Sequence, residues 1–229
     1  MSDDPIAMLR QVPLFAELPD EELSRLAAML RRRTFRRGEV IFHRGDPAGA
    51  MHILSTGRVK VSRPSEDGNE TVLALLGAGA CFGEMAALDG GLRTATITAV
   101  EQTETQMLLR EDVLSFARTS PDLAMALVHT LTDRLRRTDD WLDDAYFADL
   151  DTRLANRLLE LAEAHGEETT EGIVVNFPLT QSDLAGMLGA TRARVNRMLG
   201  IYQDAGLLRL GTGTFTILDR EGIEDRAAR

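Results

Sequence analysis

Cysteine is almost absent from this sequence of 229 residues, in which Cys81 stands alone. A single thiol excludes a disulfide framework, a four-cysteine zinc site and a cysteine-ligated iron–sulfur cluster. Histidine is also scarce, and its four copies are scattered without metal-ligand spacing, at His43, His52, His129 and His165. This scatter argues against metal-dependent hydrolysis of nucleotides, as by a phosphodiesterase, and we expect neither a metal nor an enzyme activity.

Long apolar runs are missing as well. The longest charge-free stretch of interest, Thr71–Gly83, has 13 residues and is broken by glycine, so it is too short to cross a bilayer. The opening residues, MSDDPIAMLR, contain two aspartates and lack the apolar centre of a secretory signal. We therefore expect a cytoplasmic protein of two domains with no membrane partner.

Positive charge is in deficit, because 26 basic residues face 36 acidic ones and the net charge is −10. This balance argues against nucleic-acid binding by the chain as a whole. Lys60 is the only lysine, and the other basic residues are arginines, which suit bidentate contacts to phosphate and guanine. The stretch Leu179–Gly211 departs from the overall balance, with four arginines against two aspartates.

The front half alternates short β-type runs with glycine turns, which is typical of a barrel or a sandwich. A short helix is predicted before them, over Pro19–Arg33, because apolar residues recur there at helical spacing. The predicted strands are Glu39–His43, Met51–Ser55, Val59–Arg63, Thr71–Leu76 and Thr94–Val100.

A long helix is predicted over Pro121–Phe147, which contains no internal glycine or proline. Alternating steps of four and three residues define a heptad face made of Ala124, Val128, Leu131, Leu135, Thr138, Leu142 and Ala145. The heptad face favours pairing with a second copy of the chain, and the alternative is a core helix lying across its own barrel. A hinge is expected at 148–152, then a helix over Arg153–His165 and a polar loop, GEETTEG.

The C-terminal part has the residue types of a helix-turn-helix at the required offsets. Counting from Gln181, the small, turn-forming and apolar positions are Ala185, Gly189, Val195 and Met198. Thr180 with Asp183 predicts an N-cap for the first helix, and Thr191 predicts one for the second.

The second of these helices begins with the run TRARVNR, which places Arg192, Arg194 and Arg197 near its exposed start. Arginine at this place bridges O6 and N7 of guanine in the major groove, although a merely solvated helix face is the alternative. Two β-type runs, Leu207–Leu210 and Thr214–Leu218, flank a Gly-Thr-Gly turn and predict a hairpin. A hairpin here makes the module a winged helix with donors for phosphates.

One charged pair stands out in the front half, within the run FGEMAALDGGLRTATITA. Glu84 and Arg93 lie nine residues apart. Arginine clamps a phosphate with two hydrogen bonds, and a carboxylate accepts a hydrogen bond from a sugar hydroxyl. Together they fit a ribose phosphate, and a buried ion pair in the barrel is the alternative.

These features, from about Leu14 to Leu218, resemble the cyclic-AMP receptor protein / fumarate-nitrate regulator (CRP/FNR) family of bacterial transcription factors. The glutamate–arginine spacing is also similar to that in regulatory subunits of cyclic-nucleotide-dependent kinases. The resemblance implies an α+β fold: an N-terminal β-roll (a double-stranded jelly roll) that binds a cyclic nucleotide in residues 1–120, a dimerisation helix and hinge in 121–149, and a C-terminal winged helix-turn-helix that binds DNA in 150–229. The lone Cys81 excludes the oxygen-sensing branch.

The same resemblance implies roles for single residues. Glu84 would bind the ribose 2′-hydroxyl, and Arg93 would hold the cyclic phosphate with Thr94 and backbone N–H groups near Gly83. Matching the run FADLDTRL to the family's hinge places Thr138 against adenine, with a polar register residue of the coiled coil as the alternative. Arg134 would pair with Glu84, or else form an ordinary interhelical salt bridge at the flank of the heptad face.

The expected residues form two sets. The ligand-binding set is Gly83, Glu84, Met85, Ala86, Arg93, Thr94, Ala95, Arg134, Thr138 and Asp139. The DNA-binding set is Thr180, Gln181, Thr191, Arg192, Ala193, Arg194, Asn196, Arg197 and Thr212.

Two residues depart from the family pattern. Asp139 stands where cyclic-AMP responders have a hydroxyl, and its carboxylate either accepts from the adenine amino group, repels a ligand phosphate or changes the base preference. Ala193 stands where many members have a glutamate, so only a methyl group is offered at one base pair of the half-site.

The resemblance thus implies a homodimeric transcription regulator under allosteric control by a cyclic purine nucleotide, foremost cyclic AMP. Its expected partners are palindromic promoter DNA, a second copy of the chain and RNA polymerase. Three alternatives stay open: a regulator active without ligand, one that responds to another nucleotide such as a cyclic dinucleotide, and a nucleotide sensor that acts on a protein partner.

Overall fold

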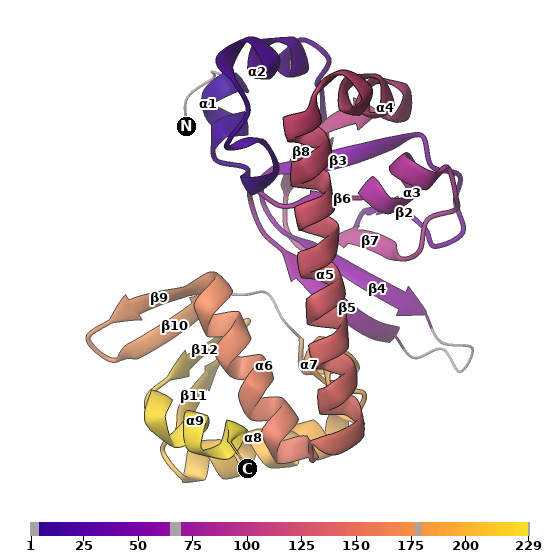
Figure 1. Ribbon diagram of the computed structural model, residues 1–229. Coiled ribbons are helices and arrows are strands. Elements are labelled where there is room, and N and C mark those ends of the chain that lie inside the picture. Colours follow the sequence, from indigo (N-terminus) through magenta and orange to yellow (C-terminus); the bar gives the residue numbers. More distant parts are fainter. Residues whose placement is uncertain (1–4, 65–69, 177–179, 229) are drawn as a thin grey trace. The chain divides into compact units, whose positions relative to one another are not determined.

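The structure is a computed structural model that describes residues 5–64, 70–176 and 180–228 (Figure 1). Two compact units make up the chain, the first of residues 1–63 and 73–136 and the second of residues 64–72 and 137–229. Among the described helices, none combines the length and the apolar character that crossing a membrane requires.

Short helical elements open the first unit: α1 (Pro5–Arg10), η1 (Pro13–Phe15) and α2 (Asp20–Ala27). Acidic residues fill the first turn of α2, where they stabilise the positive end of the helix dipole. The helix predicted over Pro19–Arg33 is wrong at its end, because Arg31–Phe35 form strand β1. β1 pairs with the distant strand β8 (Thr103–Leu109), and this long-range pairing outweighs the local helical pattern.

Two four-stranded sheets form the body of the first unit, in the orders β1-β8-β3-β6 and β2-β7-β4-β5. The remaining strands are β2 (Val40–Phe42), β3 (Ala50–Thr56), β4 (Val59–Pro64), β5 (Glu70–Leu76), β6 (Cys81–Phe82) and β7 (Thr96–Ala99). All five predicted strands are therefore present, and β1, β6 and β8 are additional. Leu54, Val59, Phe82 and Ile97 pack together in one buried cluster of this unit.

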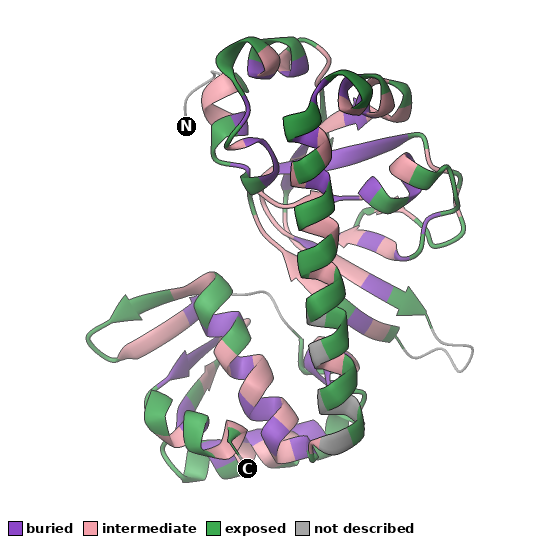
Figure 2. Ribbon diagram, in the orientation of Figure 1, coloured by how far each residue is buried: buried purple, intermediate pink, exposed green. Residues whose placement is uncertain are grey.

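Three helices complete the first unit: α3 (Glu84–Asp89), α4 (Arg110–Thr119) and α5 (Pro121–Phe147), the last of which runs on into the second unit. The predicted bounds of α5 are confirmed. Its Leu123 and Leu127 are buried, whereas Val128, Leu135 and Leu142, seven residues apart, are 52%, 60% and 42% exposed. Exposed positions recur along most of the length of α5 (Figure 2). The last heptad position, Ala145, lies outside the described side chains.

The second unit begins its own helices with α6 (Leu150–His165), which starts three residues earlier than predicted. Asp149 is the reason, because its side chain accepts a hydrogen bond from the backbone N–H of Thr152 at 2.9 Å and caps the helix. The predicted polar loop is also wrong, since Gly166–Thr169 form strand β9. β9 is an edge strand whose exposed polar side chains face solvent, and so its composition resembles that of a loop.

The other elements are β10 (Gly172–Asn176), α7 (Gln181–Met187), α8 (Arg192–Asp204), β11 (Leu208–Gly211), β12 (Thr214–Ile217) and α9 (Arg220–Ala227). The strands form one sheet in the order β11-β12-β10-β9, which confirms the predicted hairpin after the second helix. A β-sheet unit, a long helix and a winged helix-turn-helix thus follow one another, as the α+β prediction required.

Candidate functional site

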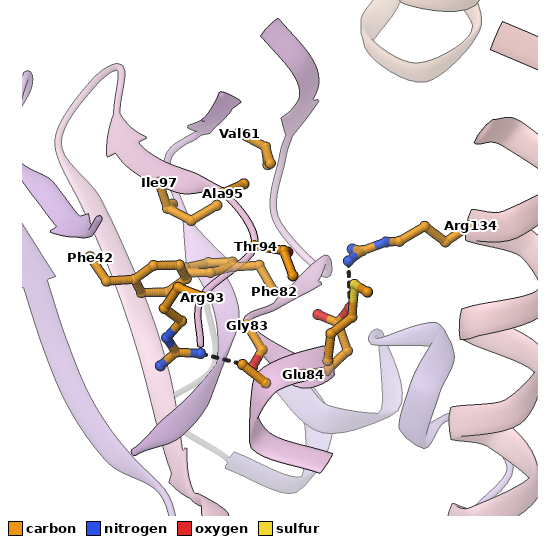
Figure 3. A pocket seen from close by; sticks show the side chains of 12 residues that line it. Phe42, Val61, Phe82, Gly83, Glu84, Arg93, Thr94, Ala95, Ile97 and Arg134 are labelled. Atoms are coloured by element: carbon orange, nitrogen blue, oxygen red, sulfur yellow. Dashed lines mark hydrogen bonds and ion pairs between the residues drawn. The ribbon is translucent and has the colours of Figure 1, made fainter. Parts of the chain in front are cut away.

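A pocket in the first unit is partly open to solvent, and the space that it bounds, open solvent included, is about 360 Å³ (Figure 3). Its walls come from four strands, from α3 and from α5. The lining residues are Phe42, Val61, Phe82, Gly83, Glu84, Met85, Ala86, Arg93, Thr94, Ala95, Ile97 and Arg134.

A left-handed glycine places the carboxylate of the pocket. Gly83 has a φ of +76° and turns the chain from β6 into α3, whose first residue is Glu84. A Cβ on Gly83 would lie 2.5 Å from Nη1 of Arg93, so only glycine fits between the turn and the guanidinium. The side chain of Glu84 is 1% exposed.

One of the two carboxylate oxygens of Glu84 is hydrogen-bonded, and the other lacks a partner among the described residues. Its Oε1 accepts a hydrogen bond and ion pair from Nη1 of Arg134 on α5, whereas Oε2 is buried and has no hydrogen-bond partner among the described residues. A buried oxygen without a donor is costly. It is therefore suited to a ligand that supplies a hydroxyl donor.

The guanidinium of Arg93 is the positive group of the pocket and is held from three sides. Nη1 donates to the backbone oxygen of Gly83 at 2.8 Å, and Nη2 donates to that of Ala50 at 2.6 Å. The ring of Phe42 covers its face, with Cζ 4.0 Å from the ring centroid, while Nε is buried and has no hydrogen-bond partner in the described part of the chain. Burial lowers the pKa of Arg93, and the nearby carboxylates of Asp46 and Glu84 oppose this effect.

The lone thiol of the chain is not a reactive group of this site. Burial, and secondarily Glu84, raises the pKa of Cys81 to about 12, and Arg134 opposes this shift. The thiol therefore stays protonated at neutral pH and lacks the thiolate that nucleophilic chemistry needs.

The structure brings eight of the ten predicted ligand-binding residues together, namely Gly83, Glu84, Met85, Ala86, Arg93, Thr94, Ala95 and Arg134. Thr138 and Asp139 follow Arg134 on α5, are exposed and do not line this pocket, so their ligand roles stay predictions. The sequence reasoning missed the apolar walls formed by Phe42, Val61, Phe82 and Ile97. Alternating apolar residues in the predicted strands are the signal that could have identified these walls.

The second unit contains the predicted helix-turn-helix. Thr180 and Asp183 form a reciprocal capping box at the start of α7, which confirms the predicted cap. Ala185 is buried where α7 meets α8, and Gly189 has a φ of +57° in the turn between them. The side chain of Thr191 caps α8 by accepting from the backbone N–H of Arg194, as predicted.

The described surface of α8 presents most of the predicted DNA-reading residues. Arg192, Ala193, Arg194 and Arg197 are exposed. Asn196 is different, because it is half-buried and its amide oxygen is buried with no hydrogen-bond partner among the residues that the structure describes. Thr180 and Gln181 are exposed at the start of α7, and Thr212 is exposed in the turn between β11 and β12.

Comparison with known proteins gives two family matches. The model of the cyclic nucleotide-binding domain matches residues 32–120, and that of the Crp-like helix-turn-helix domain matches residues 152–226. The cyclic AMP receptor protein of Thermus thermophilus is 36% identical, over 94% of this chain and 96% of its own. A CRP-like cAMP-activated global transcriptional regulator of Mycobacterium tuberculosis is 31% identical, over 96% and 98% of the two chains.

One solved relative responds to a different nucleotide. The c-di-GMP-responsive global regulator CLP of Xanthomonas campestris superposes with a TM-score of 0.74 at 25% identity, covering 87% of this chain and 99% of its own. The matches agree on a nucleotide-binding unit joined to a DNA-binding unit. They differ in the nucleotide that their names give, which is cyclic AMP for the first two relatives and c-di-GMP for CLP.

Proposed function

Because the chain belongs to the CRP/FNR family of cyclic-nucleotide-binding transcription regulators, we propose that it is a homodimeric regulator whose affinity for promoter DNA is controlled by cyclic AMP bound in the first unit. The single observation that carries the ligand assignment is that Glu84 and Arg93 are both buried and line the same pocket, where one carboxylate oxygen of Glu84 lacks a hydrogen-bond partner among the described residues. Oε2 of Glu84 accepts a hydrogen bond from the ribose hydroxyl, and Arg93 binds the cyclic phosphate. The first turn of α3 adds backbone N–H groups that have no helical partner.

Arg134 links this pocket to the long helix, since it lies on α5 and pairs with Glu84. A ligand that donates to Oε2 of Glu84 leaves Oε1 with Arg134, so the carboxylate connects the ligand to α5. The ligand shifts the balance between two states only by its differential affinity for them, and a tenfold preference is worth about 1.4 kcal/mol. Thr138 and Asp139, on the next turn, are proposed to contact the base.

The ligand assignment is tested by calorimetric titration of cyclic AMP into the wild-type chain, Arg93→Ala and Arg118→Ala. Arg118 is an exposed arginine of the first unit outside the pocket, so it controls for the lost charge. We expect saturable binding by the wild type and Arg118→Ala, and none by Arg93→Ala at the same folded fraction in circular dichroism. Normal binding by Arg93→Ala would show that the pocket is assigned wrongly.

A second ligand is favoured by one finding, the c-di-GMP-responsive relative. Titration of cyclic GMP and c-di-GMP beside cyclic AMP decides between these nucleotides. Binding of c-di-GMP alone would replace cyclic AMP in the proposal and leave the regulator itself unchanged.

The DNA-reading role is supported by the exposed arginines at the start of α8. Reversing Arg192 and Arg197 to Glu should abolish binding to the duplex that the wild-type chain selects from a random pool. The control reverses Arg157 and Arg220, which lie on α6 and α9 and change the net charge equally. If both double variants bind alike, then α8 is not the reader.

The proposed dimer uses the exposed row Val128, Leu135 and Leu142 on α5, at the spacing of one heptad position. Two copies joined there would present two α8 helices to a palindrome with half-sites about 34 Å apart. Sedimentation equilibrium should give a dimer for the wild type and for Arg136→Glu, a charge change beside the row, and a monomer for Leu135→Glu. A dimeric Leu135→Glu would move the interface elsewhere.

A further inference from the structure

The C-terminal helix α9 is joined to the start of α6 and the end of α8 by a cluster of polar contacts, all within the second unit. Nη1 of Arg226 on α9 lies 3.2 Å and 3.0 Å from Oδ1 and Oδ2 of Asp151, in the first turn of α6. The backbone oxygen of Arg226 accepts a hydrogen bond from Oγ1 of Thr152 at 3.3 Å. These contacts fix the end of α9 on the helix that follows α5.

The same arginine also contacts the recognition helix. Its Cζ lies 4.8 Å from the ring centroid of Tyr202, two residues before the end of α8. The hydroxyl of Tyr202 donates to the backbone oxygen of Asp151 at 3.1 Å. Tyr202 is fully buried, and burial raises its pKa, so the hydroxyl remains a donor at all physiological pH values. α6, α8 and α9 therefore meet at one cation–π and hydrogen-bonded cluster.

The position of this cluster in the chain gives it a consequence for DNA reading. Asp151 lies two residues after Asp149, the N-cap of α6, where the chain leaves α5. The reading residues begin at Arg192, ten residues before Tyr202 on the same continuous helix. A helix moves as a rigid rod over this length, about 15 Å, so the orientation of α8 is set at the Tyr202 end as well as at the turn after α7.

We propose that Arg226 is a positioning residue for the recognition helix: by bridging Asp151 and Tyr202, it makes α8 turn with α6 when α6 reorients at its junction with α5. Arg226 touches no base in this role and acts only through α8. The inference rests on the proposed function, because it assumes that α8 reads DNA.

α9 itself supplies a matched control. Arg220 lies on the same helix and pairs with Glu163 of α6 at 3.3 Å and with Glu224 of α9, neither of which lies on α8. Arg226→Met and Arg220→Met therefore remove the same charge from the same helix. They differ in whether the bridge to Tyr202 is lost.

The experiment measures fluorescence anisotropy on two duplexes, the one that the full wild-type chain selects from a random pool and a scrambled version of it, with saturating cyclic AMP. We expect Arg226→Met to reduce the selected-to-scrambled affinity ratio at least fivefold, with unchanged affinity for the scrambled duplex. Arg220→Met should keep the wild-type ratio. A merely structural loss of folded protein would lower both affinities together and leave the ratio unchanged.

Two further variants keep the inference testable. Asp151→Asn removes the charge that Arg226 pairs with and keeps the size of the side chain, so it should lower the ratio two- to fivefold even if Arg226→Met does not fold. Arg226→Lys, which keeps the charge beside Asp151, should recover part of the ratio. A wild-type ratio in Arg226→Met or in Asp151→Asn overturns the inference. If the wild-type chain selects no duplex, the proposed function itself fails, and this inference fails with it; the two failures are distinguished by the wild-type measurement alone.

Discussion

Acidification should weaken the first unit through one buried histidine. His52 on β3 is 6% exposed, its ring stacks on Phe82 with centroids 5.1 Å apart, and Nδ1 lies 3.0 Å from Oγ1 of Thr105. Burial lowers the pKa of His52 from 6.5 to about 4, and the positive charges of Arg93 and Arg33 act in the same direction. His52 is therefore neutral at pH 7, which leaves Arg93 as the cation next to it in the pocket wall.

The sign of the effect follows from proton binding. Between pH 6.5 and 4 the unfolded state binds a proton at His52 and the folded state does not, so stability present above pH 6.5 is lost as the pH falls. A difference of 2.5 between the pKa values of the two states corresponds to about 3 kcal/mol over the whole window. Between pH 7.5 and 5.5 the expected loss is roughly 1.3 kcal/mol.

Amide hydrogen exchange of β3 measures this loss, because it reports the free energy of opening strand by strand even when two units unfold separately. The control is His52→Gln, which keeps a hydrogen-bonding group near Thr105 and does not titrate in this range. Wild type should lose roughly 1.3 kcal/mol more than His52→Gln between pH 7.5 and 5.5, after correction for intrinsic exchange. Equal losses in the two chains would refute the argument that burial keeps His52 neutral.

Four substitutions give further expectations. Gly83→Ala should weaken cyclic-AMP binding at least tenfold in calorimetry, because its Cβ collides with Arg93 and its φ is unfavourable for alanine. Arg134→Met should lower the free energy of unfolding by about 1–3 kcal/mol in urea titration, less than for a fully buried pair because Arg134 is 41% exposed. Thr180→Ala should cost about 0.5–2 kcal/mol of stability in the second unit, measured by hydrogen exchange of α7. Arg192→Ala should reduce discrimination at one guanine by about 1–3 kcal/mol in a competition assay, with unchanged cyclic-AMP affinity.

Local signals in the sequence predicted several features whose stabilising groups are close in the chain, although the cap of α6 at Asp149 was missed. The capping box of Thr180 and Asp183 and the left-handed Gly189 involve groups only a few residues apart, so their spacing predicted the helix-turn-helix. The same holds for the polar side of the pocket, since Gly83, Glu84 and Arg93 lie on one short run. The bounds of α5 were also predictable, because helix-breaking residues are absent from it.

Long-range pairing explains what the sequence did not reveal. Arg31–Phe35 became a strand because β8, some seventy residues later, offers an antiparallel partner. The apolar wall of the pocket was missed for a similar reason. Phe42 and Val61 come from strands that approach the segment with Glu84 and Arg93 only when the sheets form. The cation–π contact between Phe42 and Arg93 is the clearest case, because no spacing rule connects a residue on β2 with one just before β7.

The overall charge of −10 then has a definite meaning for a DNA-reading protein. Non-specific affinity comes from neutralised phosphates and grows with the number of basic contacts. In this chain the proposed contacts are Arg192, Arg194 and Arg197, and the net negative charge opposes binding to the polyanion. Under the proposed function a single module has little affinity for random DNA. The proposed dimer binds more stably, because joining two modules makes the second contact intramolecular. We therefore expect that Leu135→Glu, which separates the subunits of the proposed dimer, removes operator binding almost entirely rather than halving it.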